Sequence, residues 1–219
     1  MIRTGVLLLI ALVFAALDSM GESWKNVLAA MPLPQSALPL RRENCISICL
    51  TNFRSNAVVK ALIFLPGVSD DLYLIDRDKK DLAIEAGNLF EALCRLTNST
   101  RLSIIFREPF LLVHTARDRC EPAIIFNHSS TVTTLMERRS IPELVCSDAH
   151  WDSIQPILQK SLHMRVRPLT GSKDDWHFNR HNLAAYGATD LELVSALSLT
   201  ARTTASIQRK RVIFDVRTP

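Results

Sequence analysis

The sequence contains only six glycines in 219 residues, against ten prolines. So few glycines argue against the glycine-rich loops that cradle phosphates and against flexible low-complexity linkers. The G-x-S-x-G sequence of many serine hydrolases and the H-E-x-x-H sequence of zinc proteases are both absent. Charged residues make up 22% of the chain and hydrophobic residues 47%. We therefore expect the chain to fold around a buried core.

The chain carries little net charge, formally +4. This mildly basic balance gives no particular support to nucleic-acid binding, and we expect no nucleic-acid partner. Two short basic stretches occur, Arg138-Arg139 and Arg209-Lys210-Arg211. Contact with acidic partners or lipid headgroups is one interpretation, but runs this short are more typical of a solvated surface.

An uninterrupted apolar run, Val6–Leu17, follows Arg3 near the N-terminus. Together with the small residues Ser19 and Gly21 that follow, it predicts a secretory signal peptide over residues 1–21. The run is shorter than the roughly 20 apolar residues of a transmembrane helix, and an uncleaved N-terminal anchor is the alternative. We therefore expect an exported protein, periplasmic or extracellular, whose membrane contact is limited to this run.

Export would place the cysteines in a compartment where disulfides persist; they are Cys45, Cys49, Cys94, Cys120 and Cys146. Because their number is odd, at least one thiol is free or pairs with another chain. The letters CISICL predict that Cys45 and Cys49 share one strand, about 13 Å apart, where they cannot bridge. Buried thiols acting as small hydrophobic side chains fit the sequence as well as a disulfide framework does.

The clearest local pattern lies in residues 81–118. Leu82–Ala86 alternates as a half-buried strand does, and Asn88 can then cap a helix. The apolar face of that helix is predicted to hold Leu89, Ala92, Leu93 and Leu96. Two more strand-like runs follow, at 102–106 and 110–114. The stretch therefore predicts a β-α-β-β unit.

Weaker copies of this unit are predicted in the rest of the chain. The first has a strand, a helix and a strand at 45–50, 53–64 and 72–75. The third has a strand at 144–146, a cap at Ser147-Asp148, a helix beginning near Ser153 with Trp151, Ile154, Ile157 and Leu158 on one face, and strands at 164–169 and 176–178. The last has a strand at 183–186, a turn at Gly187, a helix at 190–200, and a hairpin of 205–207 with 212–216. True internal duplication and an ordinary α+β meander both remain open.

The predicted fold class is thus α+β, with repeated β-α-β-β units whose helices pack on small mixed sheets. The prolines within residues 22–40 predict a linker between the export signal and the folded body. The body itself is divided into a first half, 41–135, and a second half, 136–219.

The order strand, capped helix, strand, strand resembles the small N-terminal modules of secretins and the short N-terminal module of TonB-dependent transporters. The similarity spans about Asp81 to Asn179 and is carried by Leu89, Ala92, Leu93, Leu96 and Thr97. Ser99-Thr100 stands where such modules commonly have a glycine, and no barrel-forming strands follow. The resemblance implies an envelope binding or assembly module that works through edge strands and surface contacts, without catalysis. It transfers no functional residue to this chain.

A polar cluster late in the chain supports a different hypothesis. Cys146, His150, His177 and His181 form a C-x3-H and an H-x3-H pattern, compatible with zinc ligation. Cys146 with His150 or His177 could also act as a nucleophilic pair, oriented by Asp148 or Asn179. Paired cysteines of the C-x2-4-C kind are absent from these stretches, so polar residues at strand ends are the simpler interpretation.

From the sequence we expect an exported, non-enzymatic module that binds or assembles with an envelope protein. We assign no catalytic residue and no cofactor. The alternative is an exported metal- or thiol-dependent enzyme that uses Cys146, His150, His177 and His181. The sequence leaves open the partner, the oligomeric state and the cysteine pairing.

Overall fold

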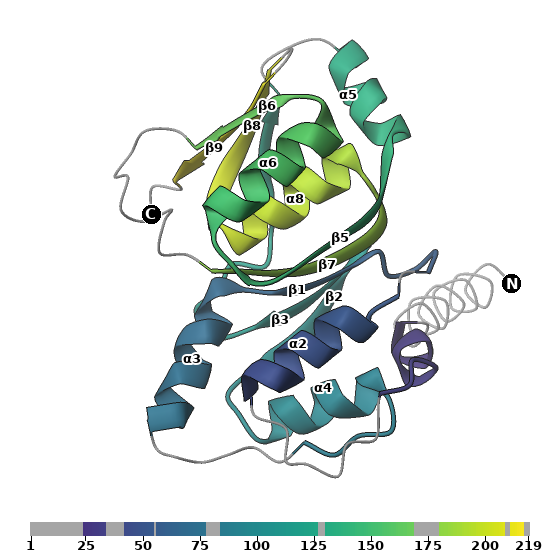
Figure 1. Ribbon diagram of the computed structural model, residues 1–219, viewed down its shortest axis with the longest axis vertical. Coiled ribbons are helices and arrows are strands. Elements are labelled where there is room, and N and C mark those ends of the chain that lie inside the picture. The colour runs from purple at the N-terminus through teal and green to yellow at the C-terminus, as the bar shows by residue number, and fades with distance from the viewer. Residues whose placement is uncertain are drawn as a thin grey trace, which may run out of the picture.

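In the computed structural model the chain folds into two mixed β-sheets with packed helices (Figure 1). The structure describes residues 24–33, 42–54, 56–77, 84–126, 130–168, 180–208 and 211–216. Its elements are α2 (Arg42–Asn52), β1 (Ala61–Phe64), α3 (Pro66–Arg77), α4 (Leu89–Asn98), β2 (Ser103–Arg107), β3 (Phe110–His114), β4 (Ala123–Phe126), α5 (Ser130–Arg138), β5 (Ser140–Ala149), α6 (Trp151–Leu162), β6 (Arg165–Pro168), β7 (His181–Thr189), α8 (Asp190–Thr200), β8 (Thr203–Gln208) and β9 (Arg211–Val216). This arrangement confirms the predicted α+β class.

The larger sheet has five strands in the order β2-β3-β1-β7-β5. Its central strand β1 is parallel to β3 and antiparallel to β7. All four residues of β1 are buried, as expected for a strand covered on both faces. The sheet combines strands from both sides of residue 135, because β5 and β7 lie beyond that position and the other three strands precede it.

The smaller sheet has four strands in the order β4-β8-β9-β6. β8 and β9 form an antiparallel hairpin, which confirms the hairpin predicted from 205–207 and 212–216. The two outer strands, β4 and β6, run parallel to their neighbours. Each therefore presents one unpaired edge to the surroundings, among the strands that the structure describes.

The two faces of the five-stranded sheet bury different side chains. Ile63 and Leu112 point into a cluster that also contains Phe214 of the smaller sheet; we call this cluster the inter-sheet core. Leu62 and Leu111 point the opposite way, into a cluster shared with α2 and α4, which we call the outer core. The period-2 alternation of strand side chains thus supplies both cores from the same strands.

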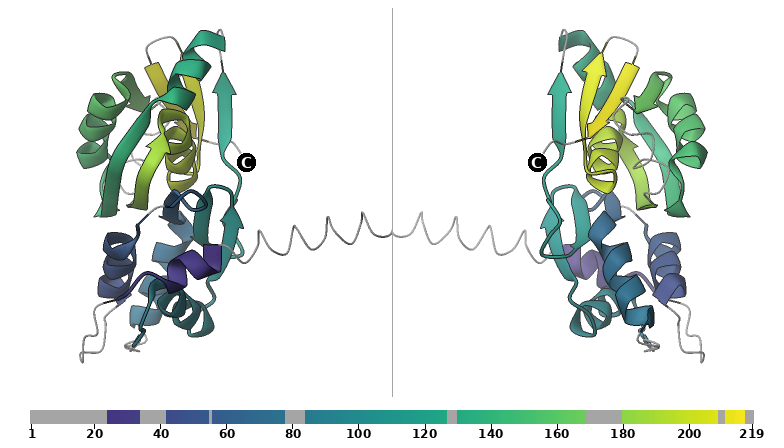
Figure 2. Two further views of the ribbon diagram at one scale, coloured as in Figure 1. Left: turned by 90° about the vertical axis from the view of Figure 1, so that its right-hand side faces the viewer. Right: turned by 90° about the vertical axis from the view of Figure 1, so that its left-hand side faces the viewer.

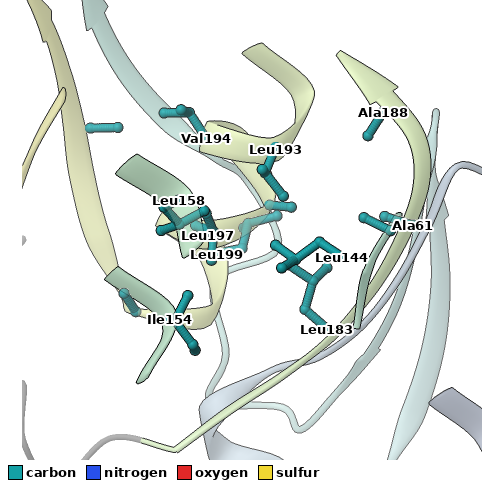
Figure 3. Close-up of a cluster of buried hydrophobic side chains, with 14 of the residues drawn as sticks. Ala61, Leu144, Ile154, Leu158, Leu183, Ala188, Leu193, Val194, Leu197 and Leu199 are labelled. Carbon is teal, nitrogen blue, oxygen red and sulfur yellow. The ribbon is translucent and has the colours of Figure 1, made fainter. Parts of the chain in front are cut away.

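Helices α6 and α8 lie between the two sheets, whereas α2 and α4 cover the other face of the larger sheet (Figures 1 and 2). Every residue from Leu193 to Thr200 in α8 is buried, as expected for a helix enclosed on all sides. Figure 3 shows Leu193 and Leu197 of α8 facing Leu144 and Leu183 of the larger sheet. The molecule is therefore layered helix, sheet, helix, sheet.

Two predicted helices are confirmed, and both have N-caps: Asn88 was predicted to cap α4, whereas the Thr189 cap of α8 was not predicted. Asn88 caps α4 by accepting a hydrogen bond from the backbone N–H of Glu91, at 2.8 Å. In α8, Thr189 accepts from the Glu192 backbone N–H, and the Glu192 carboxylate accepts from the Thr189 N–H. This reciprocal arrangement satisfies two donors that a helix end otherwise leaves without partners.

The first predicted unit is wrong. Residues 45–50 belong to helix α2 and not to a strand, and the buried residues of α2 are Arg42, Cys45, Ile46, Cys49 and Leu50. Their spacing is that of one helix face, and the Sγ atoms of Cys45 and Cys49 lie 4.0 Å apart. The β-branched isoleucines and the local alternation suggested a strand, but packing against the sheet follows the helical period.

The predicted and observed elements also disagree in the residues that follow α2. The helix predicted at 53–64 is wrong, because the described residues 53, 54 and 56–60 form no helix and 61–64 form β1, and the strand predicted at 72–75 lies inside α3. The short run Ala61–Phe64 is apolar throughout and is buried on both faces. A continuous apolar run of four residues does not by itself distinguish a central strand from part of a helix.

The other units are partly confirmed. β3 coincides with the strand predicted at 110–114 and β2 lies one residue beyond the strand predicted at 102–106, whereas Ile84–Ala86 form no strand. In the third unit, Ser147-Asp148 belong to β5 and do not cap α6, and Ile157 is 49% exposed. The strand predicted at 176–178 lies outside the described residues.

α6 begins at Trp151, two residues before the predicted start. Gly187, predicted as a turn, lies within β7 with a φ of 61°. The predicted signal peptide 1–21 and residues 22, 23 and 34–40 of the predicted linker lie outside the described residues. Residues 24–33 are described, and their Leu28, Met31 and Leu33 are buried in the outer core. Among the helices that the structure describes, none is long and apolar enough to cross a membrane.

Candidate functional site

The structure places three of the four predicted metal candidates near one junction, where β5 meets α6 and β7 begins. Cys146 lies in β5, His150 directly precedes α6, and His181 opens β7. His181 pairs with Ala149 across the two strands. His177 lies outside the described residues. Among those residues, no three histidine, cysteine or acidic side chains cluster as metal ligands would.

Cys146 is poorly suited to act as a nucleophile. Its side chain faces the inter-sheet core and is 8% exposed. Burial raises the pKa of the Cys146 thiol to about 11, opposed by a hydrogen bond from the Leu183 backbone. A reactive cysteine needs a lowered pKa and some solvent access. The buried thiol with its raised pKa therefore does not support Cys146 as the nucleophile of a thiol-dependent enzyme.

His181 is completely buried. Its Nδ1 lies 3.0 Å from the hydroxyl of Thr200, which donates its own proton to the Leu197 carbonyl. Nδ1 must therefore donate to that hydroxyl, and the lone pair falls on Nε2. Nε2 has no hydrogen-bond partner among the residues described. Burial, followed by the charge of His150, lowers the pKa of His181 to about 4, so the imidazole is neutral at pH 7.

The polar residues around this junction shape the backbone. Asp148 has a positive φ of 51° at an irregularity in the pairing of β5 with β7. The Asn182 side chain accepts from the Asp148 backbone N–H at 2.7 Å, and Arg180 forms an ion pair with the Asp148 carboxylate. The His150 carbonyl accepts from the N–H groups of Ser153 and Ile154. These contacts stabilise the turn into α6.

A second polar cluster, which no sequence pattern predicts, lies at the carboxyl ends of β1 and β3. The buried Asp118 carboxylate accepts from the backbone N–H groups of Gly67 and Thr115 at 3.1 and 2.8 Å, and from the Thr115 hydroxyl at 2.9 Å. Arg202, which follows α8, donates to the same carboxylate at 3.0 Å. A Cβ atom at Gly67 would lie 2.7 Å from both Asp118 and Thr115. Because protein donors surround the carboxylate, we interpret the cluster as a structural contact that ties the carboxyl ends of β1 and β3 to the turn after α8. We call it the tie at Asp118.

The most exposed apolar feature among the described strands is the edge strand β4. Ile124 packs against the inter-sheet core, whereas Ile125 and Phe126 are 51% and 44% exposed. In register, Ile125 lies beside Ser206 of β8, on the sheet face that points away from α8. Figure 2 shows β4, the upper teal strand, at the margin of the smaller sheet. Leu135 of α5, the next helix along the chain, is 56% exposed.

The repeated β-α-β-β pattern does not predict this edge strand. The letters Ala123-Ile124-Ile125-Phe126 form a β-branched and aromatic run, which is a strand signal in itself. Such a run does not indicate whether the strand lies at an edge or in the middle of a sheet. The edge position follows from the structure, because β8 is the only described strand that pairs with β4.

Comparisons with known proteins do not identify the chain: no family model, no curated protein and no solved structure matches it. The resemblance to secretin and TonB-dependent transporter modules therefore stays a prediction. The described geometry offers two features for a function, the apolar edge at β4 and the buried histidine at the start of β7. Of these, only the edge is open to a large partner.

Proposed function

We propose that this protein is an exported, non-enzymatic module that binds another protein of the cell envelope through the edge strand β4. The exposed pair Ile125 and Phe126 on that edge carries the proposal. Natural proteins usually shield an edge strand with charge, proline or a covering element, because a bare edge pairs with other chains. Ala123–Phe126 contains no charged residue and no proline, and among the described strands none pairs with the outer edge of β4.

The chemistry of such an edge suits strand addition. An extended segment of the partner would hydrogen-bond to the open backbone edge of β4, and its side chains would contact Ile125. β4 itself is held firmly, because four consecutive residues pair in parallel with β8 and Ile124 packs into the inter-sheet core. A rigid edge lowers the entropic cost of binding.

Export rests on the sequence. The apolar run Val6–Leu17 with its flanking residues is the pattern of a signal peptide. A partner in the envelope is the consequence of that location, and the secretin-like pattern supports a role in assembly. The enzymatic alternative has weaker support, because the thiol of Cys146 is buried with a raised pKa.

The proposal is tested by photo-crosslinking in the cells that make the protein. A benzoylphenylalanine residue replaces Ile125 in the full chain, and the matched control replaces Ile157, which is similarly exposed but lies on α6. We expect one envelope protein to be captured from position 125 and not from position 157. Substitution Phe126→Lys in the same chain should then abolish the crosslink.

Two results would contradict the proposal. Equal capture of the same proteins from both positions would show that the crosslinks report exposure and not a binding edge. Capture that survives Phe126→Lys would show that the edge contributes nothing to recognition. Fractionation of the same cells checks export, because a chain found only in the cytoplasm would overturn the location.

A further inference from the structure

The smaller sheet has one face that points away from α6 and α8, and we call it the outer face. Val166 of β6 and Phe214 of β9 point the other way, into the inter-sheet core. Because side chains alternate along a strand, the residues on either side of Val166 point outward, as does every second residue of β9. The outer face therefore carries Arg165 and Arg167 of β6 and Arg211 of β9, and all three are exposed.

The positive charge of these arginines is not balanced by the residues around them. Among the ion pairs formed by the residues that the structure describes, none includes Arg165, Arg167 or Arg211. Arg165 lies directly beside Arg211 in the register of β6 with β9, and like charges placed opposite each other in a sheet are destabilising. Asp215 supplies the one negative charge among the described outer-face positions, at the opposite end of β9 from Arg211.

A row of outward side chains connects the arginines with the binding edge at β4. In register, Ile125 of β4 lies beside Ser206 of β8. Ile213 of β9 comes next in this row, and Arg167 of β6 ends it. With strands about 4.8 Å apart, the row spans about 14 Å, which an extended chain crosses in about five residues.

We propose that the outer face binds an acidic segment of the same envelope protein whose strand adds to β4. Apolar side chains of that segment would contact Ile125 and Ile213, and its carboxylates would pair with Arg165 and Arg167. Guanidinium groups suit this role, because their planar fork binds a carboxylate through two parallel hydrogen bonds. The inference rests on the function proposed above, and it adds the chemistry by which the partner is recognised.

A polypeptide fits this face better than a lipid surface does. Proteins that lie on membranes combine positive charge with apolar side chains that insert below the headgroups. Ile213, the apolar residue beside Arg167, is only half-exposed in the sheet, and Asp215 on the same face repels anionic lipids. The carboxylates of a peptide can meet the arginines one by one and avoid Asp215.

The test places benzoylphenylalanine at Ile213 of the full chain, in the cells that make the protein. We expect capture of the same envelope protein that position 125 captures. Arg165→Glu/Arg167→Glu should lower capture from position 213 about tenfold, because two exposed ion pairs are replaced by two repulsions. Glutamate keeps the edge of β6 charged, so its protection against pairing with other strands is unchanged.

The matched control is the double variant Arg101→Glu/Arg107→Glu. It reverses two exposed arginines that lie outside the smaller sheet, and it should leave capture unchanged. An equal loss in this control would show that only the overall charge of the chain matters, and it would overturn the inference.

Stability gives a second readout, which a purely structural role of Arg165 would move the other way. Arg165→Glu places opposite charges side by side on β6 and β9, and the melting temperature of the purified chain should rise by about 1–3 °C. A fall in the melting temperature would mean that Arg165 is already paired within the fold, and it would overturn the inference.

The remaining outcomes separate this inference from the function on which it rests. Capture from position 125 but not from 213, or capture from 213 that survives the reversals on β6, overturns the acidic segment and leaves binding at the edge in place. No specific capture from either position overturns both. The purified chain is also mixed with vesicles of phosphatidylcholine with and without phosphatidylglycerol. Binding that needs phosphatidylglycerol and is lost in Arg165→Glu/Arg167→Glu would assign the arginines to lipid and overturn the inference.

Discussion

The two faces of the five-stranded sheet are covered in different ways. On one face α8 lies between two sheets and is buried along its length from Leu193 to Thr200. On the other, α4 buries only one side, and residues such as Arg95 of this helix reach solvent. Both cores are filled from alternate residues of the same strands. The two cores therefore differ because of the second sheet. The inter-sheet core is bounded by a sheet on both sides, whereas the outer core is bounded by a sheet on one side.

The largest effect should come from leucines at matched positions in these helices. Leu197 of α8 and Leu93 of α4 are both fully buried. Leu197→Ala leaves a cavity that two sheets prevent from closing, and we expect a loss of about 4 kcal/mol, against about 2.5 kcal/mol for Leu93→Ala. Urea unfolding of both variants measures the difference. Equal losses would mean that the second sheet adds no constraint.

The second prediction concerns pH, because the inter-sheet core contains His181. Its pKa falls from 6.5 to about 4 on folding, so the folded protein keeps this imidazole neutral while the unfolded chain takes up a proton below pH 6.5. The stabilisation is complete above pH 6.5 and is lost as the pH falls to about 4. We expect a loss of about 3 kcal/mol over that interval.

Unfolding by urea at pH 7 and pH 4 measures this loss. The variant His181→Gln should remove most of the dependence, whereas the control His163→Asn should keep it. His163 is exposed and ends α6 in a left-handed conformation that asparagine also adopts. An unchanged pH profile in His181→Gln would refute the assignment.

The third prediction addresses the tie between the carboxyl ends of β1 and β3 and the turn after α8. Asp118→Asn turns an amide toward donors that now surround a carboxylate, and we expect a loss of about 2 kcal/mol. Asp148→Asn is the control, since the Asp148 side chain is 57% exposed and asparagine tolerates its positive φ. Thermal unfolding should rank the two variants in that order. A control variant as unstable as Asp118→Asn would argue against the tie.

The smallest effect on stability should come from removing the N-caps of α8 and α4, and it should be equal on the two faces of the five-stranded sheet. Thr189 caps α8 and Asn88 caps α4, each by accepting a backbone N–H three residues on. Thr189→Ala and Asn88→Ala should each cost about 1 kcal/mol, because a cap satisfies a donor whatever core lies beyond it. Melting temperatures test this. A much larger cost at Thr189 would show that the enclosed helix depends on its cap.

The elements predicted well are those whose signals are local. The helix at 190–200 and the hairpin after it were predicted from the pattern of the repeated unit, and α4 from Asn88 and its apolar face. The first unit failed because CISICL alternates over six letters, although Arg42, Cys45, Cys49 and Phe53 are spaced as one helix face. A longer window would have favoured the helix, since tertiary burial follows the longer period.

Of the candidate site, the sequence indicated the residue types but not their environments. It named Cys146, His150 and His181 as candidates, but the depth of burial that raises the pKa of Cys146 and lowers that of His181 depends on two sheets closing over α8. The tie at Asp118 joins residues 51 and 84 positions apart. Contacts over such separations leave no pattern in a single sequence.

By itself the sequence determined the α+β class, the capped helix α4, the helix α8, the β8–β9 hairpin and the pattern that predicts export. These follow from neighbouring residues, because capping, turn formation and side-chain periodicity act within one or two turns of chain. The tertiary structure decided that β4 is an edge, that His181 is enclosed and that the sulfurs of Cys45 and Cys49 meet. Each of these depends on which elements pack together. That packing is determined by the burial of complete apolar faces of helices and strands.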